Sequence, residues 1–523
     1  MTRMRSFFNV LVIFILSFFA TAFAQKITPA EGLQAITADS LYTHVAYLAS
    51  DKLQGRNTPS PGLDTAAAYI ARYFQYCGLK PVEKAGGYFQ KVPLLKMKLA
   101  DKTSQKFVLT VNGEAHPFAL KKDFVPLHLS ANREITAPVV FVGYSITAPE
   151  FNYDDYENVD VKGKIVLAFT GEPQEKDSSS VFDGIKRTDH SKLINKVMNA
   201  LDHGAVGFIY VTNPRHQFHR PPNPWPSLLR RRLKNAVPLT LGEKEENKLI
   251  AVQIGRNLAE EIFRPSGRTM KQVYAAINEN LQPQSFAIKN VSASISVKLN
   301  SEKFWTQNVV GLLEGSGPKL KNEIVVIGGH YDHLGARGDS VIYNGADDNA
   351  SGTVGVMTLA KAFSQCHKQP ARSILFITFA GEEKGLFGSR YYTGTDPLFP
   401  LENTIAMINL DMIGRNDTSK VEIYGGDQSP DLKKIFLEVN EEIKLPHRFV
   451  ESKKLSGGSD HMSFGRKNIP NLFFFTGFHK DYHKPTDTAE KITTEHMAQV
   501  IKAAFGVAWQ VANMPQRPKF VEQ

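Results

Sequence analysis

Apolar runs that end in metal-type side chains recur along the second half of the chain. Each run has the length and the β-branched or aromatic content of a buried strand. In an open α/β sheet, ligands bind beyond the carboxyl ends of parallel strands, so the pattern predicts that these polar residues share one crevice. The runs and residues are EIVVIGG with His330 and Asp332, SILFITF with Glu382 and Glu383, TIAMINL with Asp411, and NLFFFTG with His483.

The alternation of these runs with helical patterns predicts the fold of this half. From residue 308 onward, strand-type runs alternate with amphipathic segments such as 352–363, 430–443 and 494–511. Such alternation is typical of an α/β fold in which helices flank both faces of a mostly parallel central sheet. We therefore predict this fold class for the main domain.

The first half of the chain has a different pattern. Residues 63–76 form a strongly amphipathic helical segment, and the turn-rich loop before it carries Arg56, which we expect on the surface. Short β-type runs joined by turns then begin at residue 137 and predict a small β-rich insert with one or two helices. We expect residues 25–125 and 286–523 to form one discontinuous main domain, with an inserted domain at 126–285.

The first residues have the pattern of a secretory signal peptide. Arg3 and Arg5 precede the apolar run 7–19, and Ala22-Phe23-Ala24 matches a small-x-small cleavage site. A membrane anchor is the alternative, but the run is short against the ~20 residues of a membrane span. No cysteine follows the run, which argues against a lipid anchor. We expect cleavage after residues 1–24 and an exported chain, periplasmic or secreted, without stable membrane insertion.

Length, charge and cysteine content set further limits. With 523 residues and 42% hydrophobic content, the chain can bury a large core and is expected to form two or three units. Loss of Arg3 and Arg5 changes the net charge from +10 to 10 − 2 = +8, and acids are interspersed with the basic residues, so we expect no nucleic-acid binding. No motif brings Cys77 and Cys366 together, and we expect two buried thiols.

The polar residues at the ends of the runs form a set that suits zinc. Imidazole and carboxylate ligands together favour zinc, whose catalytic sites keep one position open for water. Two ions ~3.5–4 Å apart need one bridging carboxylate, and we assign this role to Asp348 in the GADDN turn. Asp411 and Glu383 then divide between the ions, each of which keeps one histidine. The predicted ligands are His330, Asp348, Glu383, Asp411 and His483.

Two further acids are predicted to act beside the ions. Glu382 and Glu383 are adjacent just past a strand and point in different directions, so one can bind metal while the other faces a bound water. We assign Glu382 as the general base, which would take a proton from metal-bound water and pass it to a leaving amine. Asp332 fits a carboxylate that fixes the tautomer of His330. The alternative for GEEK is a charged start of a helix.

Six motifs together resemble a known family. GGHYDHLG, GADDNASG, FAGEEKGLFGS, INLDMIG, GGSDHMSF and HKPTDT occur in the order found in co-catalytic zinc aminopeptidases of the aminopeptidase Y and bacterial leucyl aminopeptidase type, which are related to glutamate carboxypeptidase and glutaminyl cyclase. LASDKLQGR resembles the N-terminal segment of that family, and the β-rich insert resembles its protease-associated domain. The resemblance implies a zinc-exopeptidase-like fold, the same five ligands, Glu382 as base and Asp332 behind His330. It also implies that Ser459-Asp460-His461 lines the substrate side without binding metal.

The reaction that this resemblance implies is hydrolysis of peptide bonds at free N-termini by a di-zinc enzyme, with metal-bound hydroxide as the nucleophile. Phe475 and Phe478 fit an apolar pocket for the substrate, but a place in the core is the favoured expectation for both. Three alternatives stay open: a carboxypeptidase of the glutamate carboxypeptidase type, a glutaminyl cyclase-like acyltransferase with a single zinc, and a receptor-like relative without metals. The first needs basic residues for a C-terminal carboxylate, and the second needs one metal instead of two.

Overall fold

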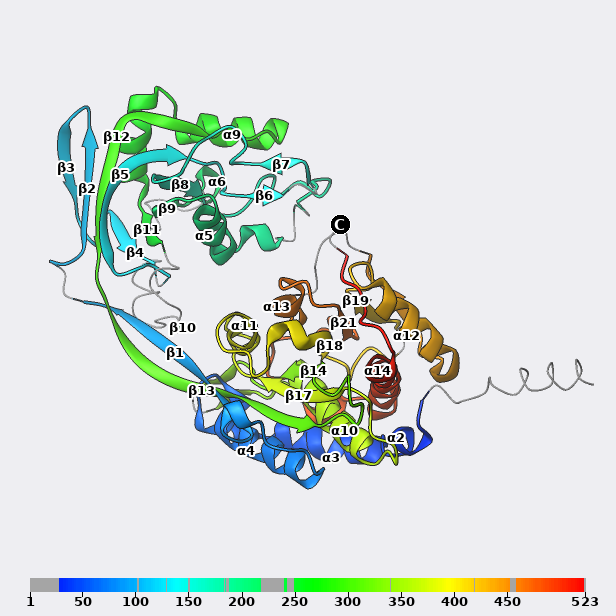
Figure 1. Ribbon diagram of the computed structural model, residues 1–523. Helices are drawn as coiled ribbons and strands as arrows, with labels where there is room; N and C mark the ends of the chain where they lie inside the picture. The colour runs from blue at the N-terminus through cyan, green and yellow to red at the C-terminus, as the bar shows by residue number, and fades with distance from the viewer. Residues whose placement is uncertain are drawn as a thin grey trace, which may run out of the picture. The chain divides into compact units, whose positions relative to one another are not determined.

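The computed structural model describes residues 28–521, apart from gaps at 101–102, 128, 149–150, 183, 185–187, 218–238, 242–248, 339, 418 and 452–457. The predicted signal peptide, residues 1–24, lies outside the described residues. The chain divides into two compact units, unit 1 with Met1–Val92 and Trp305–Gln523, and unit 2 with Pro93–Phe304. It passes from unit 1 to unit 2 within β1 (Phe89–Leu99) and returns within β13 (Leu299–Leu313), as Figure 1 shows.

A mixed sheet with a parallel centre forms the core of unit 1. In unit 1 the described strands of this sheet follow the order β1, β13, β17 (Ser373–Phe379), β14 (Ile324–His330), β18 (Thr404–Leu410), β21 (Asn471–Phe475), β19 (Val421–Tyr424) and β20 (His447–Phe449). The part of β1 that belongs to unit 2 pairs with β10 (Leu239–Leu241) of the same unit. The pairs β17–β14, β14–β18 and β18–β21 are parallel. The flanking pairs β13–β17 and β19–β21 are antiparallel. A small antiparallel hairpin, β15 (Gly335–Arg337) with β16 (Val341–Tyr343), follows β14.

The four strands that precede the predicted site residues are the parallel centre of this sheet. The fold-class prediction of an α/β protein with a parallel central sheet and an inserted β-rich domain is therefore confirmed. The antiparallel pairs lie outside this centre. Two neighbouring parallel strands need a long crossover connection, usually a helix. The helical segments between the central strands therefore account for their parallel direction.

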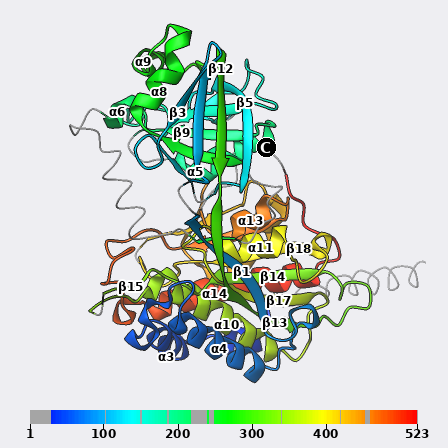
Figure 2. The same ribbon diagram turned by 90° about the vertical axis from the view of Figure 1, so that its left-hand side faces the viewer.

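Helices cover both faces of this sheet (Figures 1 and 2). Along β14, Val325 and Ile327 belong to a large core cluster, whereas Ile324 and Val326 belong to a smaller one, because successive side chains of a strand point to opposite faces. The large cluster takes residues from α2 (Ala30–Gln34), α3 (Ala38–Leu48), α4 (Pro61–Tyr76), α10 (Gly352–Ser364), α12 (Pro430–Ile443) and α14 (Thr494–Asn513). The smaller takes residues from α11 (Phe387–Gly394) and α13 (His461–Gly465). Within the described residues, no helix is long and apolar enough to cross a membrane.

Unit 2 is built on a second mixed sheet. Its described strands follow the order β3 (Glu114–Phe118), β2 (Lys106–Val111), β12 (Phe286–Val297), β5 (Arg133–Phe141), β8 (Ile165–Phe169), β9 (Gly207–Val211), β11 (Ile250–Ile254) and β4 (Phe124–Pro126). The pairs β5–β8, β8–β9 and β9–β11 are parallel. One apolar cluster joins the sheet to α8 (Arg256–Phe263) and α9 (Met270–Asn280), and another joins it to α5 (Leu193–Asp202). The described part of this unit also contains β6 (Thr147–Ala148), β7 (Tyr153–Asp154) and α6 (Pro214–Gln217).

The two cysteines are free thiols. Cys366 is buried near the end of α10, and Cys77 is half-buried directly after α4. Burial raises the pKa of each thiol to about 11. Both thiols are therefore protonated at neutral pH and contribute as small apolar groups.

Candidate metal centre

The candidate centre lies at the carboxyl ends of the parallel strands of unit 1. His330 is the last residue of β14 and pairs in register with Phe379, the last residue of β17. Asp411 directly follows β18, and Asp348 lies in the turn Ala346–Ser351 that leads into α10. The loops after β17 and β21 carry the remaining ligands. Because the strands are parallel, their ends meet at one edge of the sheet.

One group of side chains surrounds His330. Its Nε2 lies 3.5 Å from Asp348 Oδ1 and 3.2 Å from Asp411 Oδ1. His330, Asp348 and Asp411 are all buried, and their ligand atoms lie within 4.8 Å of one another, close enough to hold one metal ion.

A second group surrounds Glu383. His483 Nε2 lies 3.1 Å from Asp348 Oδ2 and 3.3 Å from Glu383 Oε2. His333, which the sequence analysis did not single out, places Nδ1 2.8 Å from Glu383 Oε1 and 3.7 Å from Asp348 Oδ2. The ligand atoms of His333, Asp348 and Glu383 lie within 4.8 Å of one another. The two groups share Asp348, and together they contain all five predicted ligands.

The donor set fits metal ions. Asp411 Oδ1 and Glu383 Oε1 are buried and have no hydrogen-bond partner among the described residues. Buried carboxylate oxygens without partners are rare in native proteins, and a bound cation satisfies such atoms. Imidazole and carboxylate ligands in a four-coordinate arrangement are typical of zinc. The residues present therefore fit a pair of zinc ions bridged by Asp348.

Burial and close charges shift the pKa values of the two adjacent glutamates in opposite directions. Burial, together with the charges of Asp411 and Asp460, raises the pKa of Glu382 well above its usual range, although His330 acts in the opposite sense. Burial also acts to raise the pKa of Glu383, but contacts with His333 and His483 hold it well below its usual range. The environment therefore favours the ionised form of Glu383, whereas it makes the carboxylate of Glu382 more basic than that of a free glutamate.

The histidines respond to the same acids. Burial acts to lower the pKa of His330, but Asp411 and Glu382 raise it well above its usual range. Burial likewise acts to lower the pKa of His483, and its contacts with Asp348 and Glu383 raise it to about 10. Without a metal ion, these imidazoles therefore hold protons that neutralise part of the acid cluster.

Asp332 connects the first group to the loop that carries the predicted base. Its Oδ1 accepts a hydrogen bond from the Glu382 backbone N–H at 3.1 Å, and its Oδ2 accepts one from Thr58 Oγ1 at 2.9 Å. His330 Nδ1 lies 3.7 Å from Asp332 Oδ1 and 3.2 Å from the backbone oxygen of the same residue. Both the carboxylate oxygen Oδ1 and the backbone carbonyl oxygen of Asp332 therefore face the His330 ring, and the carbonyl oxygen is the closer of the two.

The expectation that Arg56 lies on the surface is wrong. Arg56 is fully buried, and its hydrogen bonds within the described residues all go to backbone oxygens: Nε to Tyr331, Nη1 to Leu48 and to Asn344, and Nη2 to Gly345. Tyr331 follows one predicted ligand, and Gly345 begins the turn that carries another. A single guanidinium therefore ties together the two segments that hold His330 and Asp348.

Other supports of the ligands come from distant parts of the chain. Ser459 Oγ donates to Asp411 Oδ2 at 2.7 Å and accepts a hydrogen bond from Asn409 Nδ2 at 2.9 Å. Asp487 accepts hydrogen bonds from the backbone N–H groups of Asp347 and Asp348, each at 3.1 Å. The sequence gives no periodic signal for these partners. Ser459 belongs to the motif that the resemblance assigned to the substrate side, and the structure shows it in contact with a predicted ligand.

The two phenylalanines near His483 differ in burial. Phe475 is buried at the end of β21, whereas Phe478 is 68% exposed. The ring of Phe478 contacts Tyr482, whose ring stacks on His483 with a centroid distance of 3.8 Å. Phe475 is therefore a core residue, and Phe478 presents an aromatic surface beside the ligand.

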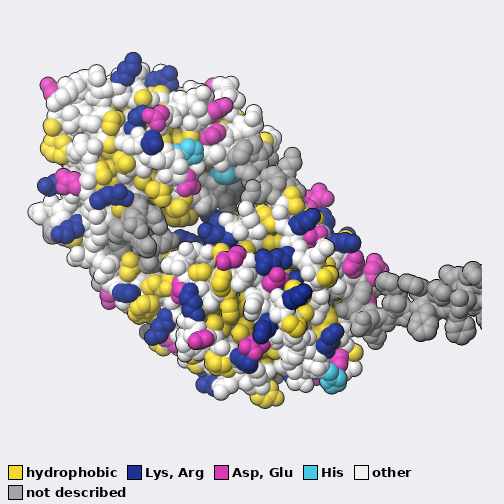
Figure 3. Space-filling model, viewed as in Figure 1, with side chains coloured by type: hydrophobic (Ala, Val, Ile, Leu, Met, Phe, Trp, Pro, Cys, Tyr) yellow, Lys and Arg dark blue, Asp and Glu magenta, His cyan; other side chains and the backbone are white. Residues whose placement is uncertain are grey.

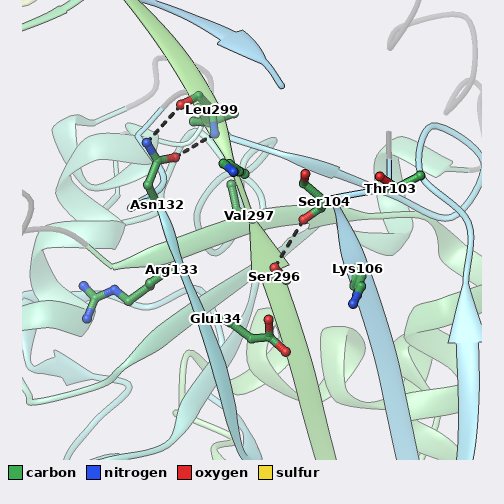
Figure 4. A pocket seen from close by; sticks show the side chains of 10 residues that line it. Thr103, Ser104, Lys106, Asn132, Arg133, Glu134, Ser296, Val297 and Leu299 are labelled. Carbon is green, nitrogen blue, oxygen red and sulfur yellow. Dashed lines mark hydrogen bonds between the residues drawn. The ribbon is translucent and has the colours of Figure 1, made fainter. Parts of the chain in front are cut away.

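A surface pocket of about 480 Å³ in unit 2 has different chemistry (Figure 4). Its lining includes Lys106, Arg133 and Glu134, and it contains none of the predicted ligands. In it, Asn132 pairs with the backbone of Leu299 through two hydrogen bonds. On the face shown in Figure 3, Lys and Arg side chains are interspersed with Asp and Glu.

The fold and the paired groups define an α/β protein with a candidate two-metal centre at the edge of its parallel strands. Residues 308–508 match the model of Peptidase family M28, and residues 135–262 match the PA domain. These two matches confirm the resemblance inferred from the sequence motifs.

Similar proteins include a probable leucine aminopeptidase of Trichophyton verrucosum (strain HKI 0517), 28% identical over 207 residues that cover 37% of this chain and 56% of that protein. Leucine aminopeptidase 2 of Arthroderma otae (strain ATCC MYA-4605 / CBS 113480) is 28% identical over 214 residues, which cover 39% of this chain and 38% of that protein. The chain thus spans about half the length of the curated relatives it matches, or less.

Among solved structures, an aminopeptidase from Aneurinibacillus sp. strain AM-1 aligns with 22% identity and a TM-score of 0.49, over 94% of this chain and 97% of that one. The zinc aminopeptidase BSAP from Bacillus subtilis aligns with 19% identity and a TM-score of 0.45, over 93% of this chain and 98% of that one.

Proposed function

We propose that this chain is an exported di-zinc aminopeptidase. The observation that carries the proposal is the position of Asp348, whose Oδ1 faces His330 and whose Oδ2 faces His483. A carboxylate between two separate donor groups is what two ions ~3.5–4 Å apart require. The match to Peptidase family M28 supports a peptide as the substrate, and the similarity to leucine aminopeptidases supports cleavage at its N-terminus.

Each ion would have its own ligands besides the shared carboxylate. His330 and Asp411 would hold the first ion, and Glu383 and His483 would hold the second. When bound, zinc would lower the pKa of a water molecule to about 7 and polarise the carbonyl group of the substrate.

Glu382 is the residue that moves the proton in this proposal. Its Oε2 lies 4.0 Å from His330 Nε2, at the edge of the first group. It accepts a proton from the attacking water and later donates that proton to the leaving amine, so the raised pKa of this carboxyl suits both steps. The hydrogen bond from its backbone N–H to Asp332 holds this loop in place.

The charges around the centre favour a free amine over a free carboxylate in the substrate. Glu382 and Asp411 present negative charge beside the first group. Arg56 lies beside the acid cluster, but it is fully buried and four of its five N–H donors already bind backbone oxygens, so it is not available for two-point binding of a C-terminal carboxylate. These observations favour an aminopeptidase over a carboxypeptidase.

The proposal can be tested with matched peptide substrates. A purified, zinc-loaded chain is assayed on one peptide in three forms: unmodified, N-acetylated and C-amidated. We expect cleavage of the unmodified and C-amidated forms, loss of cleavage after N-acetylation, and two zinc ions per chain. Cleavage that survives N-acetylation and requires a free C-terminus would instead indicate a carboxypeptidase. A single zinc with cyclisation of N-terminal glutamine would indicate a glutaminyl cyclase-like enzyme.

Export is proposed from residues 1–24, outside the part of the chain that the structure describes. N-terminal sequencing of the protein recovered outside the cytoplasmic membrane tests it. We expect a new N-terminus at Gln25; recovery of the protein in the cytoplasm with residues 1–24 intact would refute export.

A further inference from the structure

The geometry points to His333 as a third imidazole ligand, which completes the second group with four protein ligands. This inference rests on the proposed two-metal centre and goes beyond the five-ligand set that the sequence motifs imply. The second group then consists of His333, Asp348, Glu383 and His483, whereas the first group keeps three ligands.

The ring of His333 has no other evident function in the described part of the chain. It is fully buried, and neither of its nitrogens has a hydrogen-bond partner among the described residues. Glu383 Oε1, 2.8 Å from His333 Nδ1, also lacks a hydrogen-bond partner there. A shared cation would satisfy both atoms at once.

The distances suit a common ion. Ligand atoms ~2.0–2.1 Å from a tetrahedral zinc lie ~3.3 Å from each other. His333 Nδ1 lies 2.8 Å and 3.7 Å from the nearest oxygens of Glu383 and Asp348. The corresponding distances from His483 Nε2 are 3.3 Å and 3.1 Å. Both imidazoles therefore approach the same two carboxylates at distances scattered around the expected value.

Local structure holds the His333 ring toward this group. Gly345 has a φ of +60°, and a Cβ at this position would come within 2.4 Å of His333 Cγ, so the ring occupies space that glycine leaves free. The backbone N–H of His333 donates to the Arg56 carbonyl at 3.2 Å. The rings of His333 and His483 meet edge to face with a centroid distance of 5.8 Å.

Four protein ligands would give the second ion a different role from the first. Structural zinc sites are closed by four protein ligands, whereas catalytic zinc sites have three and keep one position open. Glu382 lies beside the group with three ligands, 4.0 Å from His330 Nε2. His333 would therefore close the second group with a fourth protein ligand, whereas the first group, beside Glu382, would keep a position open.

The test counts imidazole ligands directly. The full chain is stripped with a chelator and titrated with zinc alone, the bound zinc is counted, and X-ray absorption at the zinc edge measures the imidazoles per zinc. We expect two zinc ions and three imidazoles per chain. Two zinc ions with two imidazoles per chain would overturn the inference and leave the proposed function intact. Fewer than two zinc ions per chain would overturn both.

Variants provide a second measurement. In His333→Gln, we expect the affinity for the second zinc to fall by more than about 100-fold, beyond the 10–100-fold effect typical of a residue that only orients a ligand. The affinity for the first zinc and the imidazole count at that site should stay unchanged. His496→Gln, which replaces another buried imidazole on α14, is the control and should retain both zinc ions. A His333→Gln protein with an unchanged imidazole count would overturn the inference.

Discussion

Replacement of Glu382 by glutamine tests the proton-transfer step most directly. Glutamine keeps the size of the side chain and leaves the backbone hydrogen bond to Asp332 in place, but it cannot accept a proton from water. The loop that carries Glu383 should therefore keep its conformation, and both zinc ions should still bind.

The expected loss follows from the environment of this carboxyl group. General acid–base catalysis contributes about 10²–10⁴-fold to a rate, which equals about 3–6 kcal/mol at about 1.4 kcal/mol per tenfold. Burial raises the pKa of Glu382 well above its usual range, which makes its carboxylate a stronger base than that of a free glutamate. We therefore expect kcat to fall by at least ~10³-fold, in the upper part of that range.

The assay is steady-state hydrolysis of an aminoacyl arylamide, with zinc content measured on the same samples. Glu422→Gln is the matched control, because the Glu422 side chain is 16% exposed, close to the 14% of Glu382, and its partners are Arg448 and Tyr424 instead of the predicted ligands. A Glu382→Gln protein that binds two zinc ions and keeps kcat within tenfold of the unaltered chain would refute the assignment of Glu382 as the base.

Three further predictions concern the ligands and their supports. The pKa of His483 is raised to about 10 from 6.5, so the pairing of this imidazole with the acids stabilises the metal-free chain below pH 6.5, and this stabilisation is lost as the pH rises toward 10. Zinc must displace the proton of His483 in order to bind. Calorimetry should therefore show that the affinity for zinc rises between pH 6.5 and pH 10. Ser459→Ala removes the hydrogen-bond donor to Asp411 Oδ2. The affinity for the first zinc ion should then fall by about 10–100-fold, as measured in a competition assay with a chelating dye. Arg56→Lys cannot reproduce the planar set of donors and should destabilise the metal-free chain by about 3 kcal/mol, measured by urea unfolding, because charged hydrogen bonds are worth about 1.5–3 kcal/mol each.

Controls make these results interpretable. For the pH series, His483→Gln should remove most of the pH dependence of the affinity for the second zinc ion. An unchanged pH dependence in this variant would contradict the role of this imidazole. Ser316→Ala, which removes an exposed hydroxyl group, should leave zinc affinity unaltered. Arg517→Lys changes an arginine that is half-exposed, and its stability should stay within about 0.5 kcal/mol of the starting value. An Arg56→Lys protein as stable as this control would contradict the tethering role.

The sequence determined the parallel centre of the main sheet and the residues at its edge. Runs such as 324–327 are apolar on both faces, which is possible only for a strand covered by helices on either side. Such a strand is central, and its carboxyl end lies in the crevice where ligands bind. For this reason, periodicity and residue type alone were enough to select His330, Asp411 and the pair Glu382 and Glu383 as candidates.

Tertiary structure alone decided which of the predicted ligands lie close together and what supports them. His333 follows β14 in an irregular segment, where no periodicity fixes the direction of a side chain, and only the fold turns it toward Glu383. Arg56 has the sequence context of a surface loop, because its partners are backbone oxygens near residues 331 and 345, far away along the chain. Contacts of this kind depend on how the loops meet in space. Local sequence therefore selected the ligands, and long-range packing fixed their geometry.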